Sequence, residues 1–328
     1  MNIIDELKMT VEHDHYQKVI RACHSRVTFM FGGSVLAIVG PTRVGKSRAV
    51  REALRELYPA CAGKLPSFIE IDASTTDSGF ISTRYLTLTM LAKVEHPFYA
   101  GEEHGLRLNN TETVARIRLV KAIAHRGIEL IFIDEAHHLL RTKSTRSALA
   151  ALDWLKCLGN ETGVKIVLAG SYELLSACFT SAHLNGRLSL IEFPRYRPIE
   201  ADMENFHRLL ASMDPILPWA RGQSLLQNWQ LIYDGTLGCY GLLESWILTS
   251  LAEMKSAGSS RLSREHFVRT RFQQQLDPIV AEIDQGERAL SPLATVRNRS
   301  TTGSGQARKR PKPGRRKPRR DPVLEDSP

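Results

Sequence analysis

The sequence predicts an α/β fold, in which a five-stranded, mostly parallel sheet carries helices on both faces and is followed by a small α-helical domain. Three observations support this class. Short apolar runs alternate with segments of helical periodicity as far as Phe193, which is typical of strands buried on both faces. The first run ends in a glycine-rich loop that leads into a helix. From Pro198 to about Gln275 the periodicity is helical.

The composition indicates a cytoplasmic protein that makes no membrane contact. At 328 residues the chain is long enough for two domains. No apolar run approaches the roughly 18 residues of a membrane span, and Met1–Thr10 shows no apolar signal segment. The cysteines form no CxxC pair, which favours free thiols in a reducing compartment over a metal cluster. They are Cys23, Cys61, Cys157, Cys178 and Cys239.

The net charge of +9 is concentrated at the C-terminus. Between Arg297 and Arg320 there are eleven Lys and Arg residues and no acid, whereas residues 1–296 carry 33 basic and 32 acidic side chains. A segment of this composition cannot bury a core, so we expect a disordered basic tail. The folded part is therefore expected to be nearly neutral.

The first strand and its loop carry the strongest motif. After the apolar run Val35–Val39 comes Gly40, then four residues, then Gly45, Lys46 and Ser47. In this pattern glycines let backbone N–H groups surround phosphates, the lysine reaches the outer phosphates, and the serine binds Mg²⁺. The sequence therefore predicts a nucleoside triphosphate site. Its binding residues are expected to be Gly40, Pro41, Thr42, Arg43, Val44, Gly45, Lys46, Ser47 and Arg48.

The segments around this loop are predicted as helices and one further strand. Residues 1–34 are mostly helical in periodicity, and a solvated helix start explains His13 and His15 better than a metal site does. A helix over 48–57 and a strand over 67–72 follow. Residues 80–126 are predicted as broken helical segments whose basic side chains are candidates for an anionic partner or an ordinary solvated face. These are Arg84, Lys93, Arg107, Arg116, Arg118 and Lys121.

The third strand, predicted over 129–135, ends in two adjacent acids, Asp134 and Glu135. A strand that delivers two carboxylates beside a phosphate loop suits nucleotide hydrolysis. Asp134 would hold the Mg²⁺ shell and contact the nucleotide, and Glu135 would polarise the attacking water. An ordinary strand-end turn is the alternative.

Two further candidates follow the third strand. A helix over 148–158 and a strand over 164–170 precede Ser171, whose hydroxyl either bonds the water or γ-phosphate or caps the next helix. Arg187 precedes the fifth strand, predicted over 190–193. A lone arginine at such a position is ordinarily a surface residue.

Residues 198–276 are predicted to form the helical domain, with tryptophans that serve its core. Its expected helices span 200–213, 224–233, 237–255 and 263–275. The chain thus divides into an N-terminal helical segment (1–34), an α/β core (35–197), a helical lid (198–276) and a linker with tail (277–328). Residues 134–137 also spell Asp-Glu-Ala-His, a helicase signature. Because such helicases need two recombinase-like domains, one core plus a lid fits better.

In this order the motifs resemble those of AAA+ ATPases. The matching parts are Walker A at Gly40–Ser47, Walker B at Ile131–Glu135, sensor 1 at Ser171, an arginine finger at Arg187 and the helical lid. Within that group the chain is similar to the TnsC/TniB family of transposon-encoded ATPases, and more distantly to initiator ATPases. The segments that carry this likeness are Ile133–Leu139, Val167–Leu174 and Ile191–Pro194 with Arg187.

This resemblance implies a Mg²⁺-dependent ATPase that assembles with ATP into a ring or filament on double-stranded DNA. It would link a target-selection protein or complex to transposase subunits, and hydrolysis would disassemble the platform. Glu135, Ser171 and Arg187 would be catalytic, with Arg195 and Arg197 as competitors for the arginine finger. Gly238–Leu243 lacks the arginine of sensor 2, so slow hydrolysis is expected.

By position in the family, Thr83, Arg84 and Lys93 are the expected DNA contacts. The basic tail is a solvated linker, a non-specific DNA-binding segment or a transposase-docking segment. Two other functions stay open. One is a replication initiator or loader, which should carry a winged-helix domain after the lid. The other is an ATP-driven protein-interaction switch that does not bind DNA.

Overall fold

The computed structural model describes residues 14–59, 66–73, 82–97, 99, 111–140, 145–180, 187–271 and 276–291, with side chains omitted at 145–149, 177, 179 and 180. Its sheet has the order β2-β3-β4-β1-β5, and every neighbouring pair is parallel. This confirms the predicted fold class. The strands are β1 (Val35–Val39), β2 (Phe68–Asp72), β3 (Leu130–Asp134), β4 (Lys165–Gly170) and β5 (Leu188–Glu192).

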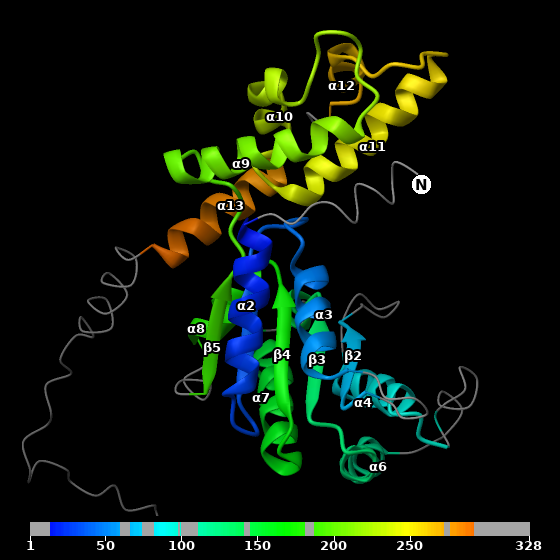
Figure 1. Ribbon diagram of the computed structural model, residues 1–328. Helices are drawn as coiled ribbons and strands as arrows, with labels where there is room; N and C mark the ends of the chain where they lie inside the picture. Colours follow the sequence, from blue (N-terminus) through cyan, green and yellow to red (C-terminus); the bar gives the residue numbers. More distant parts are fainter. Residues whose placement is uncertain are drawn as a thin grey trace, which may run out of the picture. The chain divides into compact units, whose positions relative to one another are not determined.

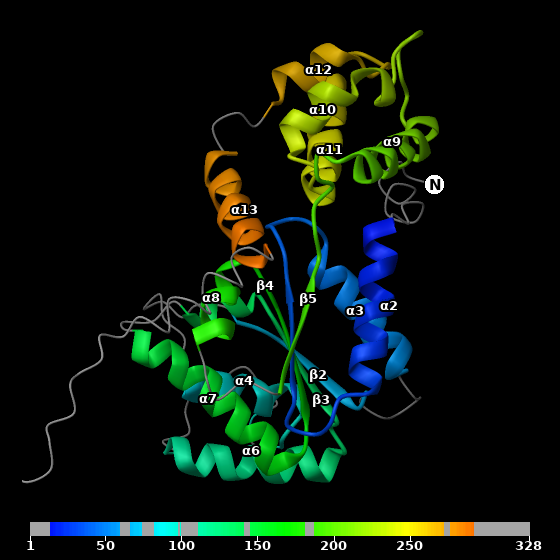
Figure 2. The same cartoon turned by 90° about the vertical axis from the view of Figure 1, so that its left-hand side faces the viewer.

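Helices cover both faces of the sheet. Figure 2 shows α2 (Asp14–Thr28) and α3 (Lys46–Leu57) on one face and α7 (Thr145–Thr162) on the other. Helices α4 (Thr83–Lys93) and α6 (Glu112–Arg126) pack against each other near β2 (Figure 1). The 3-10 turn η1 (Ala136–Leu140) lies between β3 and α7. Helix α8 (Glu173–Thr180) lies between β4 and β5.

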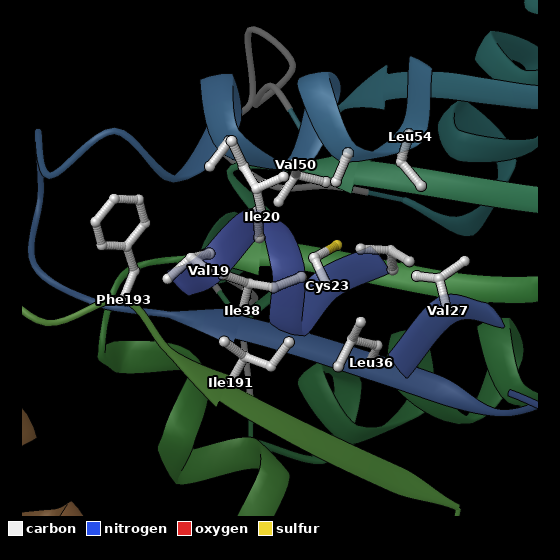
Figure 3. Packing of buried hydrophobic residues seen from close by; sticks show 14 of the residues in the cluster. Val19, Ile20, Cys23, Val27, Leu36, Ile38, Val50, Leu54, Ile191 and Phe193 are labelled. Carbon is white, nitrogen blue, oxygen red and sulfur yellow. The ribbon is translucent and has the colours of Figure 1, made fainter. Parts of the chain in front are cut away.

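One core of the α/β part lies between the sheet and the helices α2 and α3. Figure 3 shows Val19, Ile20 and Cys23 of α2 packed over Leu36 and Ile38 of β1. These five residues are at most 5% exposed. Because α2 contributes to this core, the N-terminal helix belongs to the α/β body.

The lid has its own hydrophobic core. The lid consists of α9 (Glu200–Met213), α10 (Trp229–Thr236), α11 (Tyr240–Ser256) and α12 (Arg264–Arg269), with short 3-10 turns at Asp214–Ile216 and Leu226–Asn228. Trp246 is fully buried in this core, and Trp219 and Trp229 pack against it. Among the described helices, none combines the length and apolar character that crossing a bilayer requires.

Several predicted boundaries are wrong, as three cases show. Strand β5 begins at Leu188 and ends at Glu192, so it is shifted toward the N-terminus from 190–193. The helix expected from Leu237 begins at Tyr240, because Leu237 and Gly238 adopt left-handed backbone angles (φ 52° and 73°) that end α10. Part of the predicted linker is helical, since α13 spans Asp277–Leu290.

Candidate functional site

The register of the sheet brings the predicted site residues to one edge. Val39 pairs with Gly170, so the phosphate loop after β1 and Ser171 after β4 leave the sheet side by side. On the other side of β4, Ile133 pairs with Leu168, and Asp134 follows at the end of β3. This edge is the carboxyl end of the strands, where parallel α/β folds bind ligands.

The loop conformation depends on its glycines. Gly45 has φ 106°, which side-chain-bearing residues rarely adopt, and it directly precedes α3. A Cβ on Gly40 would overlap the carbonyl oxygen of Phe193, the residue directly after β5. The loop therefore needs glycine at both positions that define the motif.

Lys46 is held by the loop itself. Its Nζ donates to the carbonyl oxygens of Gly40 at 3.0 Å and Pro41 at 2.8 Å. Burial lowers the pKa of Lys46, and the charges of Glu282 and Glu135 oppose that effect. The ammonium group thus lies in the mouth of the loop, where it can reach the outer phosphates of a nucleotide.

Ser47 and Asp134 form the contact expected of a magnesium site. The Ser47 hydroxyl donates to Asp134 Oδ1 at 2.8 Å, and the backbone N–H of Glu135 donates to the same oxygen at 2.9 Å. Asp134 is 4% exposed. A hydroxyl and a carboxylate are ligands that Mg²⁺ accepts together with phosphate oxygens and water, so these residues fit the ion.

Arg51 belongs to this cluster and was missed in the sequence. One turn after Ser47 on α3, it donates to Asp134 Oδ2 at 2.9 Å and to Glu70 Oε1 at 2.5 Å. The carboxylates of Glu70, Asp72 and Asp134 lie within 4.8 Å of one another. Arg51 therefore reduces the repulsion among three acids. The only sequence signal was its i+4 spacing from Ser47.

Glu135 and Ser171 are linked through His137, a second residue that was missed. Glu135 has a left-handed backbone (φ 50°), and its side chain is about half exposed. The Glu135 Oε2 atom lies 3.3 Å from His137 Nδ1, which is also 3.4 Å from the backbone nitrogen of Ser171. The buried Ser171 Oγ has no hydrogen-bond partner among the described residues, so it is available for a water or a phosphate oxygen.

One cavity of about 490 Å³ brings together Lys46, Ser47, Arg51, Glu135 and Ser171. Its described lining carries four cationic side chains and one carboxylate, a balance that suits a polyanion. The lining residues are Thr42, Arg43, Gly45, Lys46, Ser47, Arg48, Arg51, Glu135 and Ser171. All the predicted catalytic and metal-binding residues except Arg187 therefore lie at or next to this cavity.

Arg187 lies at the amino-terminal end of the strands, opposite to the end that carries the phosphate loop. Its carbonyl oxygen accepts from Val35 at the start of β1, and its side chain donates to Asn160. It cannot reach the phosphate loop of its own chain, so the predicted role would require a second subunit. Its competitors are both engaged: Arg195 binds Glu287 at 2.9 Å, and Arg197 binds Glu192 at 2.5 Å.

The basic residues of α4 and α6 divide into two groups. Arg116 contacts Glu161 at 3.0 Å and the Trp154 ring, and Arg118 donates to the Tyr99 hydroxyl, so both serve the fold. Arg84, Lys93 and Lys121 are exposed. The remaining predicted DNA contact, Thr83, donates to Glu112, and Arg107 lies outside the described residues.

The interpretation of His15 as part of a solvated helix start is wrong, and His13 lies outside the described residues. His15 is 6% exposed, its Nε2 lies 3.2 Å from Asp202 Oδ1, and its ring contacts Tyr196 edge-on. Because Asp202 belongs to α9, this contact joins the N-terminal helix to the lid. Long-range pairing of this kind leaves no local sequence pattern.

Residues 29–177 match the family model described as AAA domain. No curated relative matches the sequence. The ORC2 protein of Aeropyrum pernix in its ADP form has a similar structure, with a TM-score of 0.51 and 13% identity; the alignment covers 77% of this chain and 66% of that one, just under two thirds. The Walker-type ATPase of Pyrococcus abyssi aligns with a TM-score of 0.48 and 17% identity, over 87% of this chain and 76% of that one. The fold is that of an AAA+ P-loop NTPase.

Proposed function

We propose that this chain is a Mg²⁺-dependent ATPase. The observation that carries the proposal is the bond between Ser47 and Asp134 beside Lys46, which assembles both halves of a nucleotide and metal site. Lys46 and the loop N–H groups would hold the β- and γ-phosphates, and Ser47 and Asp134 would hold the ion. The bound Mg²⁺ supplies charge neutralisation on the phosphate oxygens.

The other residues of the cavity fit the hydrolytic step. Glu135 would accept a proton from the attacking water, and its half-exposed carboxylate can reach a water in the cavity. The Ser171 hydroxyl would donate to that water or to a γ-phosphate oxygen. No described cation of the chain's own lid enters the cavity lining, which supports slow turnover by a single subunit.

We further propose that the ATPase assembles on double-stranded DNA and regulates transposition. The motif resemblance to the TnsC/TniB ATPases and the eleven basic residues between Arg297 and Arg320 support this proposal. A further support is a cavity of about 240 Å³ beside α4 and α6 whose described lining holds the exposed Lys121 and Arg126 and no carboxylate. Its partners would be transposase subunits, a target-selection complex and further copies of the chain.

A replication initiator or loader is the second candidate. The structural similarity to ORC2 of Aeropyrum pernix favours it at the level of the fold. Both candidates predict ATP-dependent binding to duplex DNA. They differ in the partner, because the first should recruit a transposase and the second a helicase.

Two measurements test the ATPase assignment: nucleotide binding by calorimetry, and the rate of phosphate release. Each is made with and without duplex DNA. Lys46→Ala should weaken ATP binding about 10- to 100-fold, since it removes a charged hydrogen-bond donor. Its thermal unfolding should match that of the wild type. Retention of binding and hydrolysis by Lys46→Ala would falsify the assignment. Phosphate release that duplex DNA does not change would argue for the switch without DNA.

A further inference from the structure

Helix α13 brings a carboxylate to the phosphate loop. The Thr42 hydroxyl donates to Glu282 Oε2 at 2.9 Å, although 240 positions separate the two residues in the sequence. Burial lowers the pKa of Lys46, and the negative charge of Glu282 is the strongest influence that opposes it. Glu282 therefore acts on two loop residues, Thr42 at the tip and Lys46 at the mouth.

The Glu282 carboxylate is not fully satisfied in this position. Its Oε1 atom is buried and has no hydrogen-bond partner among the described residues. An unpaired buried carboxylate oxygen carries a desolvation cost. This cost makes Glu282 readily displaced once another anion competes for the loop.

Three further contacts hold α13 against the α/β core and lid. Glu287 forms a two-pronged ion pair with Arg195, at 2.9 and 3.3 Å. Ile283 packs in a small apolar cluster with Cys239 and Leu242 at the start of α11. These contacts fix the helix axis, so the position of Glu282 is set by the fold rather than by the flexibility of its side chain.

The third contact depends on a glycine. Gly286 is buried against Tyr172, and a Cβ at this position would overlap the Tyr172 ring. Tyr172 is itself fixed, because its hydroxyl donates to Glu192 at 2.8 Å. Gly286 thus lets α13 approach closely enough for Glu282 to reach the loop.

We propose that α13 is a nucleotide-responsive restraint on the phosphate loop, an inference that rests on the proposed nucleotide site. A polyphosphate and the Glu282 carboxylate are both anions that favour the same donors, so each weakens the binding of the other. Binding of a nucleoside triphosphate displaces Glu282 and loosens α13. By reciprocity, the docked helix lowers the affinity of the loop for the nucleotide.

The role of the Glu282 charge is tested by measuring the affinity of the chain for a slowly hydrolysed ATP analogue with Mg²⁺. Glu282→Gln keeps the shape and an acceptor for Thr42 but removes the charge. We expect tighter binding by about five- to tenfold, the size of a modest coupling between sites. The matched control is Asp284→Asn, which removes the same charge from an exposed position on α13 and should change affinity less than about twofold. Equal affinities for wild type and Glu282→Gln overturn the proposal.

The proposed loosening of α13 is tested by hydrogen exchange of the full chain with and without the ATP analogue. The α13 amides should exchange faster when nucleotide is bound, while the loop and α3 become protected. Gly286→Ala, which prevents close docking on Tyr172, should give fast α13 exchange and tighter binding without any change in charge. Unchanged or slower α13 exchange, with the loop protected, overturns the restraint alone. Absence of any protection at the loop overturns both the restraint and the proposed nucleotide site.

Discussion

Ser47 and Asp134 are 87 positions apart in the sequence, and the hydroxyl of the first donates to Oδ1 of the second at 2.8 Å. The bond joins the start of α3 to the end of β3, across the strand β4 that lies between β1 and β3. It therefore couples the phosphate loop to the acids that follow β3.

Glu135→Gln should separate binding from hydrolysis. The substitution keeps the shape of the side chain but removes the base that accepts the proton of water, so phosphate release should fall about 10²- to 10⁴-fold. Affinity for ATP should stay within about threefold, since Glu135 does not belong to the phosphate loop. Phosphate release and equilibrium binding are the measurements. Wild-type turnover by this variant would remove Glu135 from the mechanism.

Arg51→Met should destabilise the fold by about 1–2 kcal/mol. The variant leaves Asp134 and Glu70 without the guanidinium group that each binds, and Arg51 itself is only about one third exposed. The midpoint of urea unfolding measures the effect. The control is Arg55→Met, one turn further along α3 at an exposed position. Equal midpoints for the two variants would contradict a role for the Arg51 contacts.

His15 should make stability depend on pH. Burial lowers the pKa of His15 in the folded chain, although Asp202 and Asp14 oppose this effect and Lys18 adds to it. As the pH falls below about 6.5, the unfolded chain takes up a proton that the folded chain refuses, so stability is lost on acidification. His15→Gln should therefore show a smaller fall in the urea midpoint between about pH 7.5 and 5.5. Parallel pH profiles would refute this contribution.

Arg84→Ala should weaken binding to duplex DNA without affecting ATP binding. Loss of one phosphate contact should lower affinity uniformly across sequences and reduce the slope of log affinity against log salt by about one. Fluorescence anisotropy at several salt concentrations measures both quantities. Arg261→Ala, an exposed arginine of the lid, is the control. The same slope for wild type and Arg84→Ala would exclude Arg84 as a phosphate contact.

The parts of the fold that depend on local pattern could be predicted from the sequence. The five strands and the lid helix at Glu200–Met213 follow from apolar runs and helical spacing, and the phosphate loop follows from its glycines. The register then brings Ser171 next to that loop, as parallel pairing at the carboxyl edge requires. These features need no knowledge of distant contacts.

Other parts depend on pairs that are distant in the sequence. Arg51 gains its role from Glu70 and Asp134, which no spacing connects to it. Helix α13 did leave a signal, since Leu276, Ile279 and Ile283 recur at helical spacing and Pro278 follows Asp277 at the helix start. The basic segment from Arg297 onward follows α13 closely in the sequence. Its composition favoured a linker for the whole region, so the helical spacing was overlooked. The partner of Arg187 in another subunit stays a prediction.

The lid also meets the phosphate loop through main-chain atoms. The backbone N–H of Gly241 donates to the carbonyl oxygen of Arg43 at 2.7 Å, and a Cβ on Gly241 would overlap that oxygen. No side chain takes part in this hydrogen bond. The connection can therefore survive extensive sequence divergence in both segments, provided that position 241 stays glycine, and related chains can exchange the side chain of residue 43 without uncoupling lid from loop.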